Sequence, residues 1–183
     1  ETELKKPFST GINCYNKITF RFIILLYYMA TSYMILTLST LGASVDTPIS
    51  VELPLIYNTS TDHINVAWED GDTPDTILTH DYTTEGPHTV TIDAFGVDGQ
   101  FGDPSKYFSK YITSVVEWGN LGITNFSYAF SHAPIGGISM IGFPSGVKDT
   151  SYMFNVCANF DSEISFDAST VENMSHMFNG CES

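Results

Sequence analysis

Cysteine, histidine and acidic side chains are the groups of this sequence that could bind a metal or take part in catalysis. Cys157 and Cys181 lie in the last third of the chain, and the third cysteine, Cys14, lies far from both. Three cysteines are too few for a disulfide framework. The interval between Cys157 and Cys181 is also the period of a repeat described below, so we expect these two thiols to be neighbours in a stack. They would be buried free thiols or, in an exported protein, a disulfide.

Metal and cofactor sites are not indicated. The stretch "EDGDTPD" (69–75) is rich in oxygen ligands, as calcium loops are, but it lacks their helices and their distal glutamate. We interpret it as a structural turn. His63, His80 and His88 do not have zinc-binding spacing, and His80 is expected to be a hydrogen-bonding core or strand residue. With no nucleophile–base pair or phosphate-binding motif in evidence, the sequence predicts a non-catalytic protein without a metal or cofactor.

Composition and charge restrict the partners of this chain. It has 183 residues, of which 43% are hydrophobic, enough to bury a core. The formal net charge is −14, and from residue 34 onward three basic and nineteen acidic side chains give −16. Because such a surface repels phosphate backbones, we expect no nucleic-acid partner.

Residues 1–33 are interpreted as a leader. A basic flank, an apolar stretch and small residues follow one another in 20–43, as in a secretory signal. The uninterrupted apolar run, 22–30, is short for a membrane-spanning helix, so membrane association is expected through residues 20–41 only. Other hypotheses stay open: upstream sequence without structure, a core helix, or a first strand at 33–41. The first residue is not methionine and the last lies inside a repeated phrase, so we expect a fragment.

Residues 34–103 are predicted to form a small all-β domain. Segments rich in β-branched and aromatic residues alternate with turn-forming stretches such as "YNTSTD" and "TEGP". These segments are 49–56, 63–69, 77–83 and 88–96. In the last of them Val90, Ile92 and Ala94 share one face of the strand. Several short strands at this spacing favour a β-sandwich.

Two motifs in this domain follow a known pattern. They are "VAWEDGD" (66–72) and "HDYTTEGPHTVTI" (80–92), and together they resemble the PKD (polycystic kidney disease) domain family. Glu69 replaces the first turn glycine of that pattern, and His88 replaces its usual tyrosine. Independently of the family, Trp68 is expected to be a core anchor. The resemblance implies an immunoglobulin-like sandwich that serves outside cells as a spacer or binding module, without catalysis.

One eight-residue phrase occurs three times at equal intervals. The copies are "ITNFSYAF" (123–130), "VKDTSYMF" (147–154) and "VENMSHMF" (171–178). A fixed period of this length is typical of a solenoid, in which each unit completes the core of its neighbour. We therefore expect equivalent residues of successive copies to lie one above another.

Within each copy we predict a short helix. The third position is Asn125, Asp149 or Asn173, residue types that cap helix N-termini. The first, fourth, seventh and eighth positions are mostly apolar and would share one helix face. Between the copies, 137–143 and 162–168 are predicted as short strands, so that each repeat would consist of a strand and a short helix.

The third copy and its continuation, "VENMSHMFNGC" (171–181), resemble the BspA-like leucine-rich repeats, a surface-protein family also described from mycoplasmas. The resemblance begins at "WGNLGITNF" (118–126). The predicted fold class is mixed β and α/β: a PKD-like Ig-type β-sandwich (34–103), then a short leucine-rich-repeat solenoid (104–183), incomplete at its C-terminus. The aromatic connector 107–119 is predicted to form its first strand and cap, with Ile112, Val115, Val116 and Trp118 closing the open end of the stack.

The resemblances imply a non-catalytic protein at a cell or virion surface that recognises or adheres to protein or glycan partners. The residues expected to face a partner are Lys148, Asp149, Tyr152, Glu172 and His176. Two alternatives stay open. The chain is a structural spacer or virion-decoration protein without a specific ligand, or it is an accessory domain of a larger exported enzyme.

Overall fold

The computed structural model describes residues 33–57, 63–69, 76–95, 99–105, 108–136 and 138–181. The chain divides into two compact units, Glu1–Thr31 and Ser32–Ser183, and all described residues belong to the second. The predicted leader therefore lies outside the described residues, except for Tyr33. Within the described ranges, no helix has the length and hydropathy that crossing a membrane requires.

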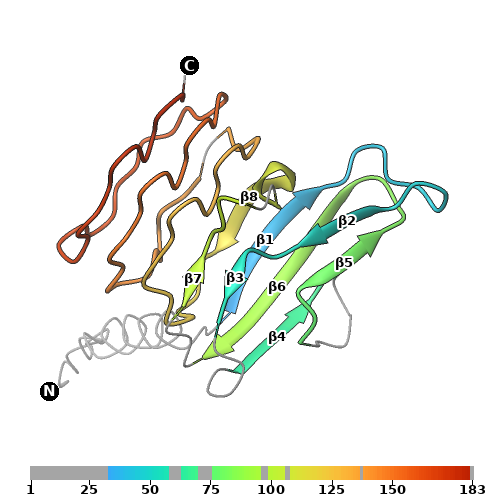
Figure 1. Cartoon of the computed structure of the whole chain (residues 1–183), viewed down its shortest axis with the longest axis horizontal. Helices are drawn as coiled ribbons and strands as arrows, with labels where there is room; N and C mark the ends of the chain where they lie inside the picture. Colours follow the sequence, from blue (N-terminus) through green and yellow to red (C-terminus); the bar gives the residue numbers. More distant parts are fainter. Residues whose placement is uncertain are drawn as a thin grey trace, which may run out of the picture. The chain divides into compact units, whose positions relative to one another are not determined.

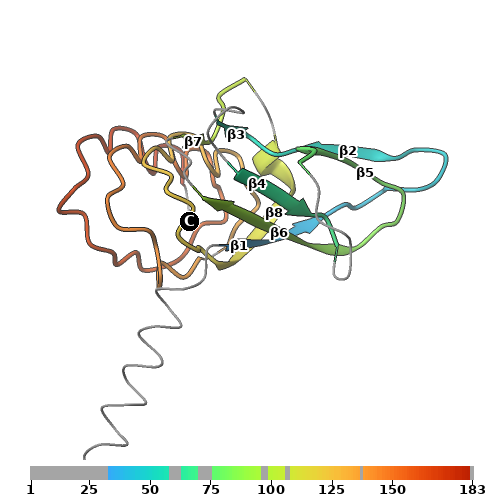
Figure 2. The same cartoon turned by 90° about the horizontal axis from the view of Figure 1, so that it is seen from below.

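Antiparallel strands form the first part of this unit. A four-stranded sheet has the order β4-β6-β1-β8. Its strands are β1 (Tyr33–Ser39), β4 (His63–Ala67), β6 (Pro87–Phe95) and β8 (Ile112–Glu117). Two smaller sheets pair β2 (Ile49–Glu52) with β5 (Thr79–Tyr82) and β3 (Leu55–Ile56) with β7 (Gln100–Phe101). Figure 1 shows the long strands β1 and β6 side by side, and Figure 2 shows β2 and β5 as a second layer over the four-stranded sheet.

Alternating apolar residues explain why these segments are strands. In β1, Met34, Leu36 and Leu38 are buried, and Leu36 lies opposite the buried Val90 of β6. Because strand side chains alternate between faces, this pattern places one apolar row of each strand in a common core. The predicted β-rich fold is confirmed, and so are strands within 33–41, 49–56, 63–69, 77–83 and 88–96.

The three copies of the repeated phrase form stacked turns of chain that we call rungs. Rung 1 is residues 123–133, rung 2 is 147–157 and rung 3 is 171–181. At every second position a backbone N–H of one rung donates to a carbonyl of the next, with N···O distances of 2.7–3.1 Å. Isolated parallel bridges join Asn125 to Asp149 and Asp149 to Asn173. The rungs, orange to red in Figure 1, are thus a ladder of paired backbones.

The predicted short helix of each copy is wrong. In the described part of the chain, the helical element is the 3-10 segment η1 (Phe108–Tyr111), and the rungs consist of turns. Inside each rung, the N–H groups at three further alternate positions, which are Ala129, Ser131 and Ala133 in rung 1, donate to the carbonyl three residues earlier, at 3.0–3.3 Å across the three rungs. An α-helix would direct every N–H to the residue four earlier. The strands predicted at 137–143 and 162–168 are also wrong, since the described residues there are turns and irregular chain.

Residues with positive φ explain how a helix-like apolar pattern builds a rung. Tyr128, Tyr152 and His176 occupy one position of the three rungs and have φ of 61°, 55° and 56°, and φ is positive again four residues later in each rung. A left-handed residue interrupts a helix and costs about 1–2 kcal/mol when it is not glycine. In rungs 1 and 2 the N–H of this residue donates to a carbonyl of the next rung, and that hydrogen bond offsets the cost.

Rung 1 packs directly on the strands. The backbone N–H of Phe101 in β7 donates to the carbonyl of Asn125 at 2.9 Å. Trp118 lies edge-on to Phe126 and Phe130, with ring centroids 6.0 and 5.7 Å away. One hydrophobic cluster runs from β1 into rung 3, so the strands and the ladder share a core.

The predicted connector contributes to this junction as a strand. Ile112, Val115 and Trp118 are buried as predicted, and the strand, β8, pairs with β1. Val116 is 64% exposed, so its predicted part in closing the stack is wrong. The pairing with β1 is irregular there: Leu36 lies opposite Val115 and Ile35 opposite Glu117, so Val116 is an extra residue that the regular alternation of β8 does not turn toward the core.

Candidate functional site

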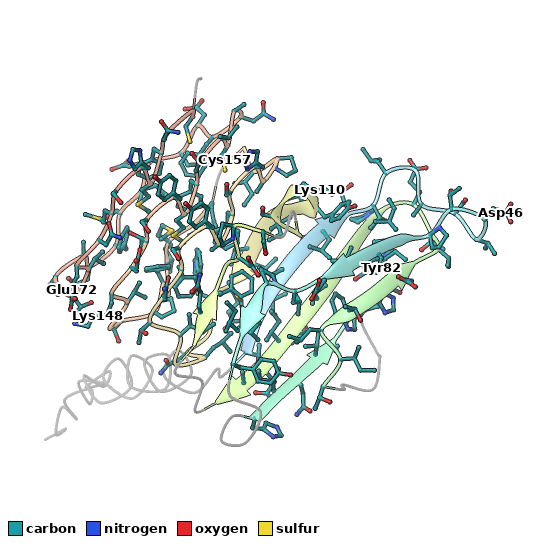
Figure 3. The ribbon with its side chains drawn as sticks, viewed as in Figure 1. Asp46, Tyr82, Lys110, Lys148, Cys157 and Glu172 are labelled. Atoms are coloured by element: carbon teal, nitrogen blue, oxygen red, sulfur yellow. The ribbon has the colours of Figure 1, made fainter. Side chains whose placement is uncertain are left out.

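The residues predicted to face a partner lie in two neighbouring rungs. Lys148 and Glu172 occupy equivalent positions, as do Tyr152 and His176, because one repeat interval separates the members of each pair. All of these side chains are exposed or half-buried, and so is Asp149, whereas the side chains between them in rung 2 are buried. We call the surface formed by these residues with Tyr128, Asn155 and Asn179 the outer face. Figure 3 shows Lys148 and Glu172 side by side at one edge of the rungs.

Lys148 and Glu172 form an ion pair between rungs. Lys148 Nζ lies 2.8 Å from Glu172 Oε1. Side-chain exposures of 52% and 72% leave both groups in water, where such a pair contributes about 0–1 kcal/mol. The pair therefore orients two charges without burying them, and a partner could displace either one.

Asp149 belongs to a column of side chains that bind the backbone. The side-chain oxygens of Asn125, Asp149 and Asn173 each accept the N–H two residues later, at 2.7–3.1 Å. The capping chemistry predicted for these residues is confirmed, but it caps a turn and not a helix. Asn173 Nδ2 also donates to Asp149 Oδ2 at 3.2 Å, which links rung 3 to rung 2.

Tyr152 lies in the middle of an aromatic column. Its ring stacks on Tyr128 with centroids 4.6 Å apart and an interplanar angle of 3°. On its other side His176 stacks at 4.7 Å and 19°. Both faces of the Tyr152 ring are covered, so its edge and hydroxyl are the parts available to a partner.

A second polar column was missed by sequence reasoning. Asn179 Nδ2 donates to Asn155 Oδ1 at 2.9 Å, and Asn155 Nδ2 donates to Ser131 Oγ at 3.2 Å. The signal was present, because Asn155 and Asn179 stand one repeat interval apart, just after the repeated phrase. An in-register amide ladder of this kind fixes the side chains at the spacing of the rungs.

The two cysteines of the repeat are free thiols in neighbouring rungs. Cys157 Sγ donates to the carbonyl of Phe130 and Cys181 Sγ to that of Phe154, both at 3.0 Å. Burial, and next the charge of Cys181, raise the pKa of Cys157 to about 12. Cys157 is therefore a neutral core thiol near neutral pH, with little nucleophilic character.

Another constellation brings together groups far apart in sequence. His88 Nε2 lies 2.8 Å from Thr40 Oγ1, and His88 Nδ1 lies 2.8 Å from Glu69 Oε1. Hydroxyl, imidazole and carboxylate in this order are the parts of a nucleophilic triad. Thr40 is fully buried, however, and its hydroxyl donates to the carbonyl of Thr84 at 3.0 Å. The constellation thus fastens the end of β1 to the turn before β6, and a substrate has no access to the hydroxyl.

Metal binding finds no support in the described residues. Among them, no group of three or more His, Cys, Asp and Glu side chains is placed to hold an ion. Of the oxygen-rich stretch 69–75, residues 70–75 lie outside the described residues. His80 lies in β5 and stacks on Trp68, with ring centroids 5.4 Å apart, as expected of a strand histidine beside a buried anchor.

One family model is similar to the part of the chain that forms the rungs, and its match does not extend to the strands. Residues 124–183 match the family model described as "Mycoplasma protein of unknown function, DUF285". The matched range contains the second and third rungs and nearly all of the first. Neither a search of curated proteins nor a search of solved structures gave a match.

Proposed function

We propose that this protein is a non-catalytic recognition or adhesion module, exposed at a cell or virion surface, which binds a protein or glycan partner through its outer face. The supporting observation is the ladder. Backbone pairing between rungs holds the outward side chains in straight columns, so the protein meets a partner with an already ordered surface. Such order lowers the entropy cost of binding.

The finer assignment of the fold belongs to the same proposal. We assign the rungs to BspA-like leucine-rich repeats and the strands to a PKD-like sandwich. The phrase repeated at a fixed interval and the mycoplasma family match of residues 124–183 support the first assignment. The second is supported by the burial of Trp68, whose indole N–H donates to the carbonyl of Ile77 at 3.2 Å, as expected of a core anchor.

The chemistry of the outer face restricts the mode of binding. Because Tyr128 and His176 cover the faces of Tyr152, a sugar ring cannot stack on that residue. A glycan could stack on the exposed ring of His176, and elsewhere on the outer face it would be held by hydrogen bonds to the tyrosine hydroxyls, the Asn155 and Asn179 amides and the exposed charges. A polar protein surface offers the same kinds of groups and is bound in the same way.

One observation favours the second candidate function, a spacer. The outward side chains bond to one another between rungs, as in the Lys148–Glu172 and Asn155–Asn179 pairs. Groups that already have partners gain less from a ligand, because each new bond replaces an old one. A spacer would use these pairs to keep the ladder straight and would bind nothing.

Immobilised full chain, probed with glycan arrays and surface-protein extracts, separates the two functions. A triple variant, Lys148→Ala with Tyr152→Ala and His176→Ala, removes the centre of the outer face. A matched control replaces exposed side chains elsewhere, Val116→Ser with Ile141→Ser. Recognition predicts specific binding that the triple variant loses and the control keeps. Absence of specific binding by the unaltered chain contradicts recognition and supports the spacer.

A further inference from the structure

The outer face repeats similar chemistry at a constant spacing. In rung 1 the aromatic Tyr128 stands three positions after Asn125 and three before Ser131, and the equivalent residues of rungs 2 and 3 follow the same order. Each rung therefore carries an aromatic ring between two polar side chains. The rings of neighbouring rungs are 4.6 and 4.7 Å apart. A ligand that runs along the ladder would meet similar groups at every rung.

Each rung also keeps hydrogen-bonding groups for a ligand. Asn155 donates one amide N–H to Ser131, and its side-chain oxygen accepts one bond from Asn179. A primary amide has two N–H groups and two lone pairs, so one of each remains at Asn155. The hydroxyls of Tyr128 and Tyr152 form no hydrogen bond with another described residue. The outer face thus offers donors and acceptors in successive rungs, as a ligand rich in hydroxyl groups requires.

The spacing of the rungs distinguishes between the two partner classes of the proposed function. An extended polypeptide advances about 3.3 Å per residue and presents the same side at every second residue, about 6.6 Å apart. It would fall out of register with the columns within a few rungs. An extended chain of pyranose rings advances by the length of one ring per unit, which is close to the separation of the rungs. Successive rings turn over in such a chain, but each carries hydroxyls on both edges, so every rung would meet a hydroxyl.

Charge restricts the class of polysaccharide. On the outer face Lys148 is paired with Glu172, which leaves the carboxylate of Asp149 without a compensating cation among these residues. From residue 34 onward the chain carries a net charge of −16. Because such a field repels polyanions, sulfated polysaccharides and those built from uronic acids do not fit. A neutral polysaccharide avoids this repulsion.

From the spacing, the hydrogen-bonding groups and the charge we infer that the outer face binds a linear, neutral polysaccharide of β-1,4-linked pyranose units, which lies along the ladder with one unit per rung. The inference rests on the proposed function and names the ligand class of the same surface. The tyrosine hydroxyls and asparagine amides would bond the sugar hydroxyls, while the ring stack holds these groups at a fixed spacing. Affinity would then increase with each unit until the ligand spans the three rungs.

The test measures how affinity depends on ligand length. Isothermal titration calorimetry on the full chain uses oligomers of one to six units of β-1,4-linked glucose, mannose or N-acetylglucosamine. For at least one of these sugars we expect affinity to increase about fivefold per unit up to three units, the effect of about one net hydrogen bond each, and by less than about twofold per unit beyond. Oligomers of α-1,4-linked glucose are the matched control, because they contain the same sugar in a coiled chain. They should show no such increase.

Tyr152→Phe provides the selective variant. It keeps the ring and both of its stacking contacts but removes the hydroxyl from the middle rung. We expect this variant to bind the three-unit ligand about fivefold more weakly. Tyr57→Phe, which removes a hydroxyl outside the rungs, should bind like the unaltered chain. NMR shifts of outer-face residues in all three rungs should change when the three-unit ligand is added.

Several outcomes would overturn the inference. They are equal affinity for one and three units, as expected of a single ring stacked on His176; unchanged binding by Tyr152→Phe; and NMR shifts confined to one rung. Specific binding of a branched or charged glycan, or of a protein, without binding of the linear oligomers would refute the inference and leave the proposed function standing. Absence of any specific partner would refute both.

Discussion

Gly102 is where β7 and rung 1 approach each other most closely, and replacing it with alanine tests how they are joined. A Cβ there would lie 2.0 Å from the carbonyl oxygen of Ser127 and 2.7 Å from the amide nitrogen of Ala129. Since Cβ atoms keep at least 3.0 Å from such atoms, the two backbones must separate by about 1 Å. Both atoms belong to the backbone, so a side-chain rotation cannot relieve the clash.

The cost of Gly102→Ala has two parts. The φ of +134° is unfavourable for alanine by about 1–3 kcal/mol. Separation also weakens two backbone hydrogen bonds, from Phe101 to Asn125 and from Gly102 to Pro54, at 2.9 and 2.8 Å, worth about 1 kcal/mol each. Loosened packing of the buried Phe101 adds about 1 kcal/mol. We expect a loss of about 4–6 kcal/mol in the free energy of unfolding, of which about 3 kcal/mol comes from the contact.

Gly86→Ala is the matched control. Its φ of +143° is nearly the same, but a Cβ there meets nothing within 4 Å, so it carries the conformational cost alone. Urea unfolding of both variants, followed by tryptophan fluorescence, measures the difference. If the two variants lose the same stability within about 0.5 kcal/mol, the spread expected of substitutions without a specific contact, the close packing of rung 1 on β7 is refuted.

Three further predictions concern the aromatic column, the buried histidine and the thiols. Tyr152→Ala removes two ring stackings and should cost about 2–3 kcal/mol in urea unfolding, while Tyr152→Phe stays within about 0.5 kcal/mol; equal losses would contradict the stack. His88→Ala should cost about 2–4 kcal/mol because it leaves the buried Thr40 hydroxyl with a partner fewer, and a change below about 1 kcal/mol would contradict that role. In a Cys14→Ser background at pH 8, a thiol reagent should modify Cys181 in the native state but Cys157 only after unfolding, because the pKa of Cys157 is raised to about 12 by burial; rapid labelling of Cys157 would contradict its placement.

Strands were predictable because their signal is local. Met34, Leu36 and Leu38 alternate with less buried residues. A β-strand puts every second side chain on one buried face, so an apolar pattern of period two predicts a strand. The pairing of β8 with β1 was not predictable, since nothing in residues 112–117 distinguishes one neighbouring strand from another. The contact of His88 with Thr40 joins residues 48 apart and leaves no mark in the sequence.

The rungs show where a periodic signal is ambiguous. The equal interval between copies correctly predicted that Phe154 and Phe178 would lie in adjacent layers, and their rings stack at 5.7 Å. The apolar pattern inside each copy predicted a helix wrongly, because turns with left-handed residues four positions apart bury the same positions. One clue was present. Gly180 shares its position with His132 and Val156, and glycine at one member of a column indicates that the backbone there has a positive φ.

The pairing of backbone groups between rungs is the claim on which the account rests, and couplings across hydrogen bonds in NMR measure it directly. In a chain labelled with ¹³C and ¹⁵N, we predict couplings from the amide nitrogen of Tyr152 to the carbonyl carbon of Ser175 and from that of Phe154 to that of Met177. A coupling from the Phe154 nitrogen to the Thr150 carbonyl, four residues earlier, would instead show a helix and contradict the ladder.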